Sequence, residues 1–95
     1  METVEIYSSK NQLENFKESV IWNDITRELE SWKEGFERER DSIVDEAATN
    51  NPSTASILLH LGDINGRIKA VNYMLSLPDV FIGLLEVKDG RNKTD

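Results

Sequence analysis

Cysteine is absent from this chain of 95 residues, and proline, histidine and aromatic residues are scarce. Without cysteine there is no disulfide framework and no thiolate metal site, a composition that fits a reducing compartment such as the cytoplasm. The single histidine, His60, is too few for a typical zinc site, because zinc takes three or four ligands among which His and Cys predominate. The two prolines, Pro52 and Pro78, are the main expected helix breaks.

Apolar residues never run for the roughly 20 positions that a membrane span needs, and the first residues form neither a basic leader nor an apolar core. We therefore expect no membrane contact. Ninety-five residues make one small domain, which buries only a limited fraction of its apolar surface. This size favours a homo-oligomer, in which a second copy covers part of the remaining surface.

The net charge is −7, from 18 acidic and 11 basic residues. Residues 22–48 carry nine acidic and four basic side chains. Direct binding to nucleic acid is disfavoured, because phosphate backbones require a concentrated cationic face. An acidic helix face can instead attract a basic protein or imitate nucleic acid toward one, and it can also simply keep a small protein in solution.

Two apolar ladders with helical spacing dominate the chain. The first contains Trp22, Ile25, Leu29, Trp32, Phe36, Ile43 and Ala47, and the second contains Ile57, Leu61, Ile64, Ile68, Val71 and Leu75. Steps of three and four put each set on one helix face. Between them, Asn50 to Ser53 favours a turn, because the residue before a proline avoids the α region. The ladders predict a long antiparallel helical hairpin.

A short helix is predicted ahead of the first ladder. Ser9 and Gln12 have the spacing of a capping box, and apolar residues follow at helical intervals, so we expect a helix over about 10–19. Either Ser19 or Asn23 then caps the long helix, because both side chains accept hydrogen bonds from the first backbone N–H groups.

The return helix is predicted to begin at a cap, Ser53 or Thr54, and to end near Ser76. Pro78 suits the first turn of a further short helix, since the N–H that proline lacks has no helical partner there. Residues 88–95 contain no apolar side chain and are predicted to form a disordered tail.

Together these signals predict an all-α fold with a short N-terminal helix, the long hairpin and a short C-terminal helix, dimerising into a four-helix bundle. Residues 1–8 are interpreted as a flexible arm or short strand, and residues 9–87 as a single helical domain. The predicted core consists of Phe16, Trp22, Ile25, Leu29, Trp32, Phe36, Ile43, Ile57, Leu61, Ile64, Ile68, Val71, Leu75 and Phe81.

Three glycines, Gly35, Gly62 and Gly66, lie inside the two predicted long helices. An antiparallel register places Gly35 near Gly66, and Gly62 lies one turn from Gly66. Glycine inside a helix costs about 1 kcal/mol relative to alanine, so we expect the two helices to approach closely there. The alternative is that these glycines are tolerated on the surface.

Residue patterns for chemistry are weak. His60 and Asp63 share a helix face, but no second imidazole or thiolate completes a metal site, and Asp63 is better used in an ion pair with Arg67. No phosphate-binding glycine loop or nucleophile elbow occurs. We assign no catalytic, cofactor-binding or metal-binding residue and expect a protein that is not an enzyme and has no cofactor.

Several residues give the chain a resemblance to a family. They are Ser19 and Trp22, then Leu61-Gly62 with Arg67, Ile68 and Val71, and finally Leu77-Pro78. The pattern resembles that of small acidic proteins of tailed bacteriophages, in which Ser and Trp open a long charged helix and a second helix ends in Leu-Pro. Gly66 and the apolar C-terminal segment depart from it. The resemblance implies a phage accessory or virion-associated protein, in the bacterial cytoplasm or the virion, and no functional residue.

We therefore expect non-enzymatic protein binding to a virion or host protein. The candidate contact residues are Glu30, Glu34, Glu37, Asp41, Asp45, Phe81, Leu84 and Leu85. An alternative is an acidic nucleic-acid mimic that inhibits a host DNA- or RNA-binding protein through the five acidic residues. A small enzyme or nucleotide-binding protein would need a polar pocket between subunits. Trp22 and Trp32 fit either a core or an interface.

Overall fold

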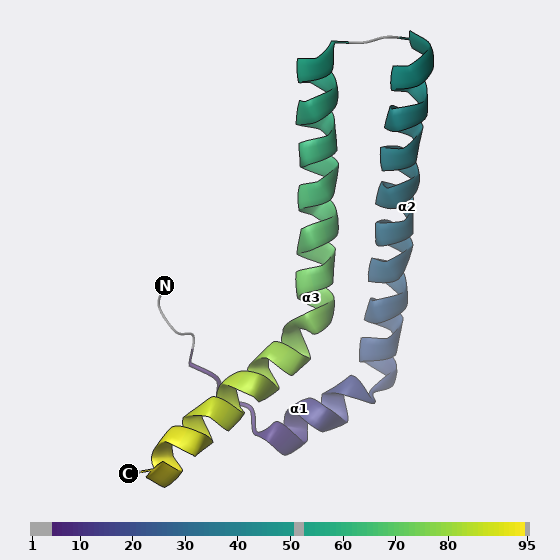
Figure 1. Cartoon of the computed structure of the whole chain (residues 1–95). Helices are drawn as coiled ribbons and strands as arrows, with labels where there is room; N and C mark the ends of the chain where they lie inside the picture. The colour runs from purple at the N-terminus through teal and green to yellow at the C-terminus, as the bar shows by residue number, and fades with distance from the viewer. Residues whose placement is uncertain (1–4, 51–52, 95) are drawn as a thin grey trace. The chain divides into compact units, whose positions relative to one another are not determined.

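The structure, a computed structural model, describes residues 5–50 and 53–94. Its helices are α1 (Lys10–Lys17), α2 (Val20–Asn50) and α3 (Thr54–Thr94) (Figure 1). No strand occurs among the described residues, so the all-α prediction is confirmed. Of the predicted arm or strand, residues 5–8 are neither helix nor strand, and residues 1–4 lie outside the described residues.

The chain divides into two compact units. Unit 1 comprises Met1–Ile25 and Ser76–Asp95, and unit 2 comprises Thr26–Leu75. Unit 1 therefore holds α1, the first turns of α2 and the C-terminal part of α3, whereas unit 2 holds the rest of α2 and α3.

The start of α1 and the junction with α2 follow the predicted capping signals. The Ser9 hydroxyl accepts the Gln12 N–H at 3.1 Å, and the Gln12 side-chain oxygen accepts the Ser9 N–H at 2.9 Å. At the junction, the Ser19 hydroxyl donates to the Phe16 carbonyl at 2.6 Å and accepts the Trp22 N–H at 3.1 Å. Ser19 is thus the cap of α2, because it satisfies an N–H that has no helical partner.

Helix α3 is longer than predicted. The Ser53 hydroxyl accepts the Ser56 N–H at 3.2 Å and caps its start, as expected. The helix then continues through Pro78, so the prediction of a separate last helix is wrong. Proline lacks the N–H that would reach the Met74 carbonyl, but it leaves the neighbouring helical hydrogen bonds in place. The bounds of α3 reach Thr94 and overlap the segment predicted as a tail.

The core of unit 2 lies where α2 and α3 run side by side (Figure 1). The buried residues of this unit are Leu29, Ile43, Ile64, Ile68 and Val71. Ile43, Ile64 and Ile68 form one cluster, with Phe36, Ile57 and Leu61 packed around it. All of these residues belong to the two apolar ladders, which therefore predicted the core of this unit well.

Some predicted core residues are instead exposed. Trp32 is 50% exposed, Ile25 is 40% exposed and Phe16 is 39% exposed, so their assignment to the core is wrong for a single chain. The Trp32 indole N–H donates to the Glu28 carboxylate at 2.8 Å on its own helix. The Phe16 ring lies 5.2 Å from the Trp22 ring between centroids. An apolar stripe as wide as these ladders is only partly covered by one neighbouring helix.

The predicted close approach at the glycines is also wrong. A Cβ atom added at Gly62 or Gly66 would meet no atom within 4 Å, and at Gly35 the nearest atom, 3.9 Å away, belongs to the same helix. Gly66 lies two residues from both Ile64 and Ile68, which is a rotation of about 200° around a helix. The glycine therefore faces away from the core that those isoleucines form.

The complete burial of Ile64 predicts that Ile64→Ala lowers the free energy of unfolding by about 2–5 kcal/mol, because it leaves a cavity in the buried cluster of unit 2. Urea unfolding followed by circular dichroism measures the loss. The matched control is Val44→Ala, since Val44 is 55% exposed, and we expect a change within about 0.5 kcal/mol. Equal losses for the two variants would contradict this assignment of the core.

The open space around Gly62 and Gly66 predicts that Gly62→Ala and Gly66→Ala each raise the free energy of unfolding by about 0.8–1.0 kcal/mol. Alanine restricts the unfolded chain and adds a methyl group that meets no atom of the chain. Urea unfolding at low protein concentration tests the sign, with the exposed Ala70→Gly as the reverse control. A loss of stability in the glycine variants would show that a close contact needs them.

Candidate protein-contact surfaces

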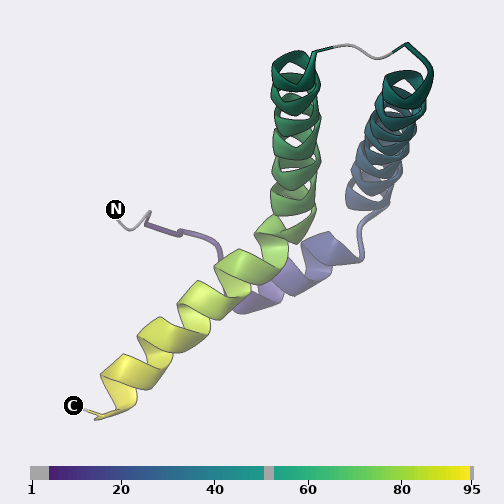
Figure 2. The same cartoon turned by 45° about the horizontal axis from the view of Figure 1, so that its top comes forward.

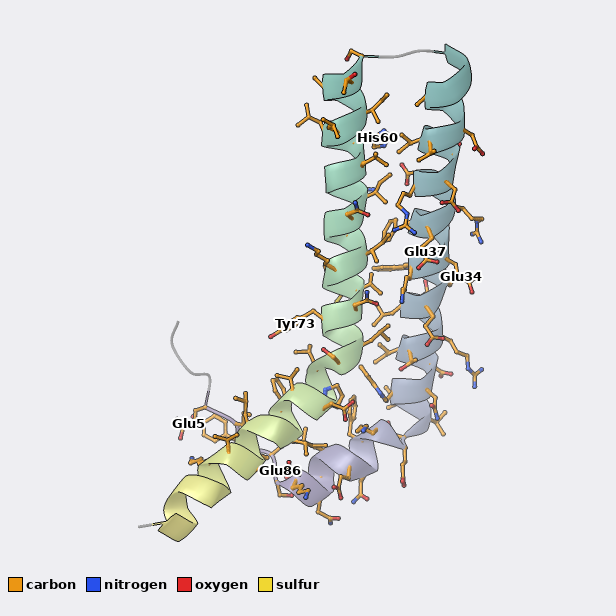
Figure 3. The ribbon with its side chains drawn as sticks, in the orientation of Figure 1. Glu5, Glu34, Glu37, His60, Tyr73 and Glu86 are labelled. Carbon is orange, nitrogen blue, oxygen red and sulfur yellow. The ribbon has the colours of Figure 1, made fainter. Side chains whose placement is uncertain are left out.

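The five acidic residues predicted as contacts lie along one face of α2. They are Glu30, Glu34, Glu37, Asp41 and Asp45, and we call them the acidic stripe. Because α2 is one continuous helix, their steps of three and four bring them together on its surface. Glu37 is half-buried and the other four are exposed. Figure 3 labels Glu34 and Glu37 on this helix.

Electrostatics make the acidic stripe slightly unfavourable for the helix. Like charges four residues apart each cost about 0.2–0.5 kcal/mol. Other carboxylates of unit 2 have partners, since Asp63 forms an ion pair with Arg67 at 2.8 Å and Glu39 lies 3.4 Å from the His60 ring nitrogen. Four residues of the stripe make no ion pair with another described residue: Glu30, Glu34, Glu37 and Asp41. The stripe is therefore a concentrated negative surface.

The apolar residues predicted as contacts lie in the C-terminal part of α3, within unit 1. Leu84 is 40% exposed, whereas Phe81 and Leu85 are half-buried. Two apolar stripes run along this part of the helix. The inner stripe is Pro78, Phe81, Ile82 and Leu85, which are buried or half-buried, and the outer stripe is Val80, Leu84 and Val87. The predicted contact residues thus belong to both stripes.

Helix α1 lies beside this part of α3 in both views of unit 1 (Figures 1 and 2). The Lys17 ammonium lies 2.5 Å from the Asp79 carboxylate, and the Lys10 ammonium lies 3.0 Å from the Glu86 carboxylate. The first residue of each pair rises in number as the second falls, so the two helices run antiparallel. Leu13, between the two lysines, is the buried residue of α1, at 8% exposed. Sequence reasoning missed this contact.

The residues considered for metal binding are engaged elsewhere. His60, labelled in Figure 3, lies 3.4 Å from Glu39. Asp63 pairs with Arg67 as predicted. The Arg67 guanidinium also lies 5.7 Å from the centre of the Phe36 ring. Within the described ranges, no group of three or more His, Cys, Asp or Glu side chains is arranged to hold a metal ion.

Three exposed apolar side chains on unit 2 were not predicted. Leu58 is 63% exposed, Leu59 is 77% exposed and Tyr73 is 60% exposed, all on α3. Figure 3 shows Tyr73 pointing away from α2. The signal in the sequence is the run from Ile57 to Leu59, which puts apolar residues on more than one helix face.

One described helix segment, Thr54–Lys88, contains an 18-residue window that is long and apolar enough to cross a membrane by length and composition. The apolar core helix of a soluble protein passes the same test, although only 11% of this window is buried. The expectation of no membrane contact stays a prediction.

Comparisons with protein-family models, with curated proteins and with solved structures find no match for this chain. No activity, ligand or partner is therefore carried over from another protein.

Proposed function

We propose that this protein is a non-enzymatic binding module whose contact with a protein partner is the apolar C-terminal part of α3. The observation that supports it best is the exposure of Leu84, at 40%, and of Val87, at 56%, beside the half-buried Phe81 and Leu85. Grouped, exposed apolar side chains are typical of protein interaction sites, because water is released when a partner covers them.

The resemblance in sequence supports a narrower proposal for the biological setting. We propose an accessory or virion-associated protein of a tailed bacteriophage, in the bacterial cytoplasm or the virion, with a virion or host protein as its partner. The net charge of −7 argues against direct contact with nucleic acid.

The acidic stripe supports an alternative function. Its carboxylates form a negative row along α2, and such a row resembles the phosphates of nucleic acid to a basic protein. In this alternative the protein inhibits a host DNA- or RNA-binding protein. Association would then weaken strongly with salt, because exposed charges are screened at high ionic strength.

We also propose that unit 2 is an antiparallel hairpin and that two copies associate into a four-helix bundle. Two contacts support the hairpin: Glu39 lies close to His60, and Phe36 lies close to Arg67. Residue numbers therefore fall along α2 as they rise along α3, which is the order of antiparallel helices. Supporting association, Leu58, Leu59 and Tyr73 are apolar side chains of unit 2 that stay exposed in a single chain.

If the C-terminal part of α3 is the contact, Leu84→Ser with Leu85→Ser abolishes partner binding while circular dichroism shows the helices intact. The measurement is affinity capture of the tagged protein from nuclease-treated bacterial lysate and from infected cells, at low and high salt, with mass spectrometry. A capsid or tail component that resists salt supports the proposal. A basic nucleic-acid-binding protein released by salt supports the alternative instead.

The matched control for this experiment is Val20→Ser with Ile21→Ser, a pair of adjacent apolar residues at the start of α2 that are 75% and 68% exposed. We expect this control to keep the partner. Retained binding in the variant with both Leu84 and Leu85 replaced would refute the proposed contact.

If unit 2 mediates association, Leu59→Glu with Tyr73→Glu halves the mass seen in sedimentation equilibrium, because buried carboxylates in an apolar interface are strongly unfavourable. The control is Ser31→Glu, which adds a carboxylate at an exposed position of α2. A wild-type protein that sediments as a monomer at all concentrations tested would rule out the four-helix bundle.

A further inference from the structure

In unit 1, a short helix is held against an apolar helix by contacts that are mostly exposed. Helix α1 has eight residues, which is too short for a helix to be stable alone in water. Its buried residue is Leu13. The two ion pairs, Lys10–Glu86 and Lys17–Asp79, have side chains between 40% and 64% exposed.

The two ion pairs have the same spacing on both helices. Lys10 and Lys17 are seven residues apart on α1, as are Asp79 and Glu86 on α3. Seven residues are close to two helical turns, so each pair of like charges lies along one edge of its helix. Asp79 directly follows Pro78, and Glu86 directly follows Leu85, so the ion pairs border the inner stripe.

These ion pairs hold α1 weakly. An exposed ion pair contributes little to stability, because water and salt screen the attraction and two long side chains lose freedom. Segments with few buried contacts open locally far more often than a protein unfolds globally. Opening of α1 therefore needs no unfolding of the core in unit 2.

The segment beneath α1 is apolar on several sides. Six of the eight residues from 80 to 87 are large and apolar, and Glu86 is the one charge among them. The segment also lies within the helix region that passes the length and composition test for a membrane span. When α1 leaves, the inner stripe joins the outer stripe as one continuous apolar surface.

We propose that α1 is a detachable strap, which covers the inner stripe of α3 and is held in register by the Lys10–Glu86 and Lys17–Asp79 ion pairs. Ionic strength and competing charges then set how often the strap opens. The consequence for partner access rests on the proposed function, since the strap covers residues next to the exposed Leu84. The opening itself is a property of the protein alone.

The absence of cysteine provides a direct assay. Ile82 lies three residues after Asp79 and four before Glu86, on the same side of α3, and it is half-buried. In an Ile82→Cys background, the rate of thiol alkylation by iodoacetamide measures opening of the strap. Lys10→Glu with Lys17→Glu turns both attractions into repulsions, and we expect about tenfold faster alkylation.

An exchange of charges between the two helices distinguishes an effect of the two ion pairs on alkylation from an effect of the net charge. Adding Asp79→Lys and Glu86→Lys to the reversed variant restores both pairs with opposite signs, and we expect the original alkylation rate to return. The matched control is Lys33→Glu with Lys69→Glu, which changes the net charge equally but lies in unit 2. Faster alkylation in this control, or no recovery on charge exchange, would overturn the proposal.

A salt titration tests the strap without charge reversal. Raising NaCl from about 0.05 to 1 M shortens the screening length to about 3 Å, so alkylation at Ile82→Cys accelerates severalfold. Val44→Cys, at a position of α2 that is already 55% exposed, reports intrinsic reactivity and stays constant. An unchanged rate at Ile82→Cys would reject the strap. Because no partner is present, this result is separate from failure of the capture experiment.

Discussion

The packing of Ile43 against Ile64 and Ile68 is the interaction on which unit 2 depends. Burial of aliphatic side chains is the main favourable term in folding, and here it comes from a single seam between two helices. A seam of this kind covers one side of each helix. The remaining apolar side chains, such as Leu59 and Tyr73, are left at the surface, where a second copy or a partner can bury them.

Local signals explain which features could be predicted from the sequence. Ser9 and Ser19 act within three residues of themselves, so their roles as caps follow from spacing alone. The periodic ladders likewise identify Ile64 and Val71 as core residues. The prediction drawn from Pro78 was wrong. Proline is common in the first turn of a helix, but a helix can also continue through a proline when the neighbouring residues stay helical, as they do in α3.

Among the candidate contacts, too, some could be predicted from the sequence and others could not. The acidic stripe was predictable, because one helix of constant period carries all of its members. The strap was not, because Lys17 and Asp79 are 62 residues apart and their pairing depends on the register between α1 and α3. The exposure of Trp32 was also missed, since spacing shows which face a residue occupies but not how much of that face a neighbouring helix covers.

The Ser19 hydroxyl makes two hydrogen bonds, one to α1 and one to α2. It donates to the last turn of α1 through the Phe16 carbonyl and accepts from the first turn of α2 through the Trp22 N–H. One atom thus closes one helix and opens the next. The end of α1 and the start of α2 therefore depend on a single side chain, so that a substitution at Ser19 removes a hydrogen bond from both helix ends at once.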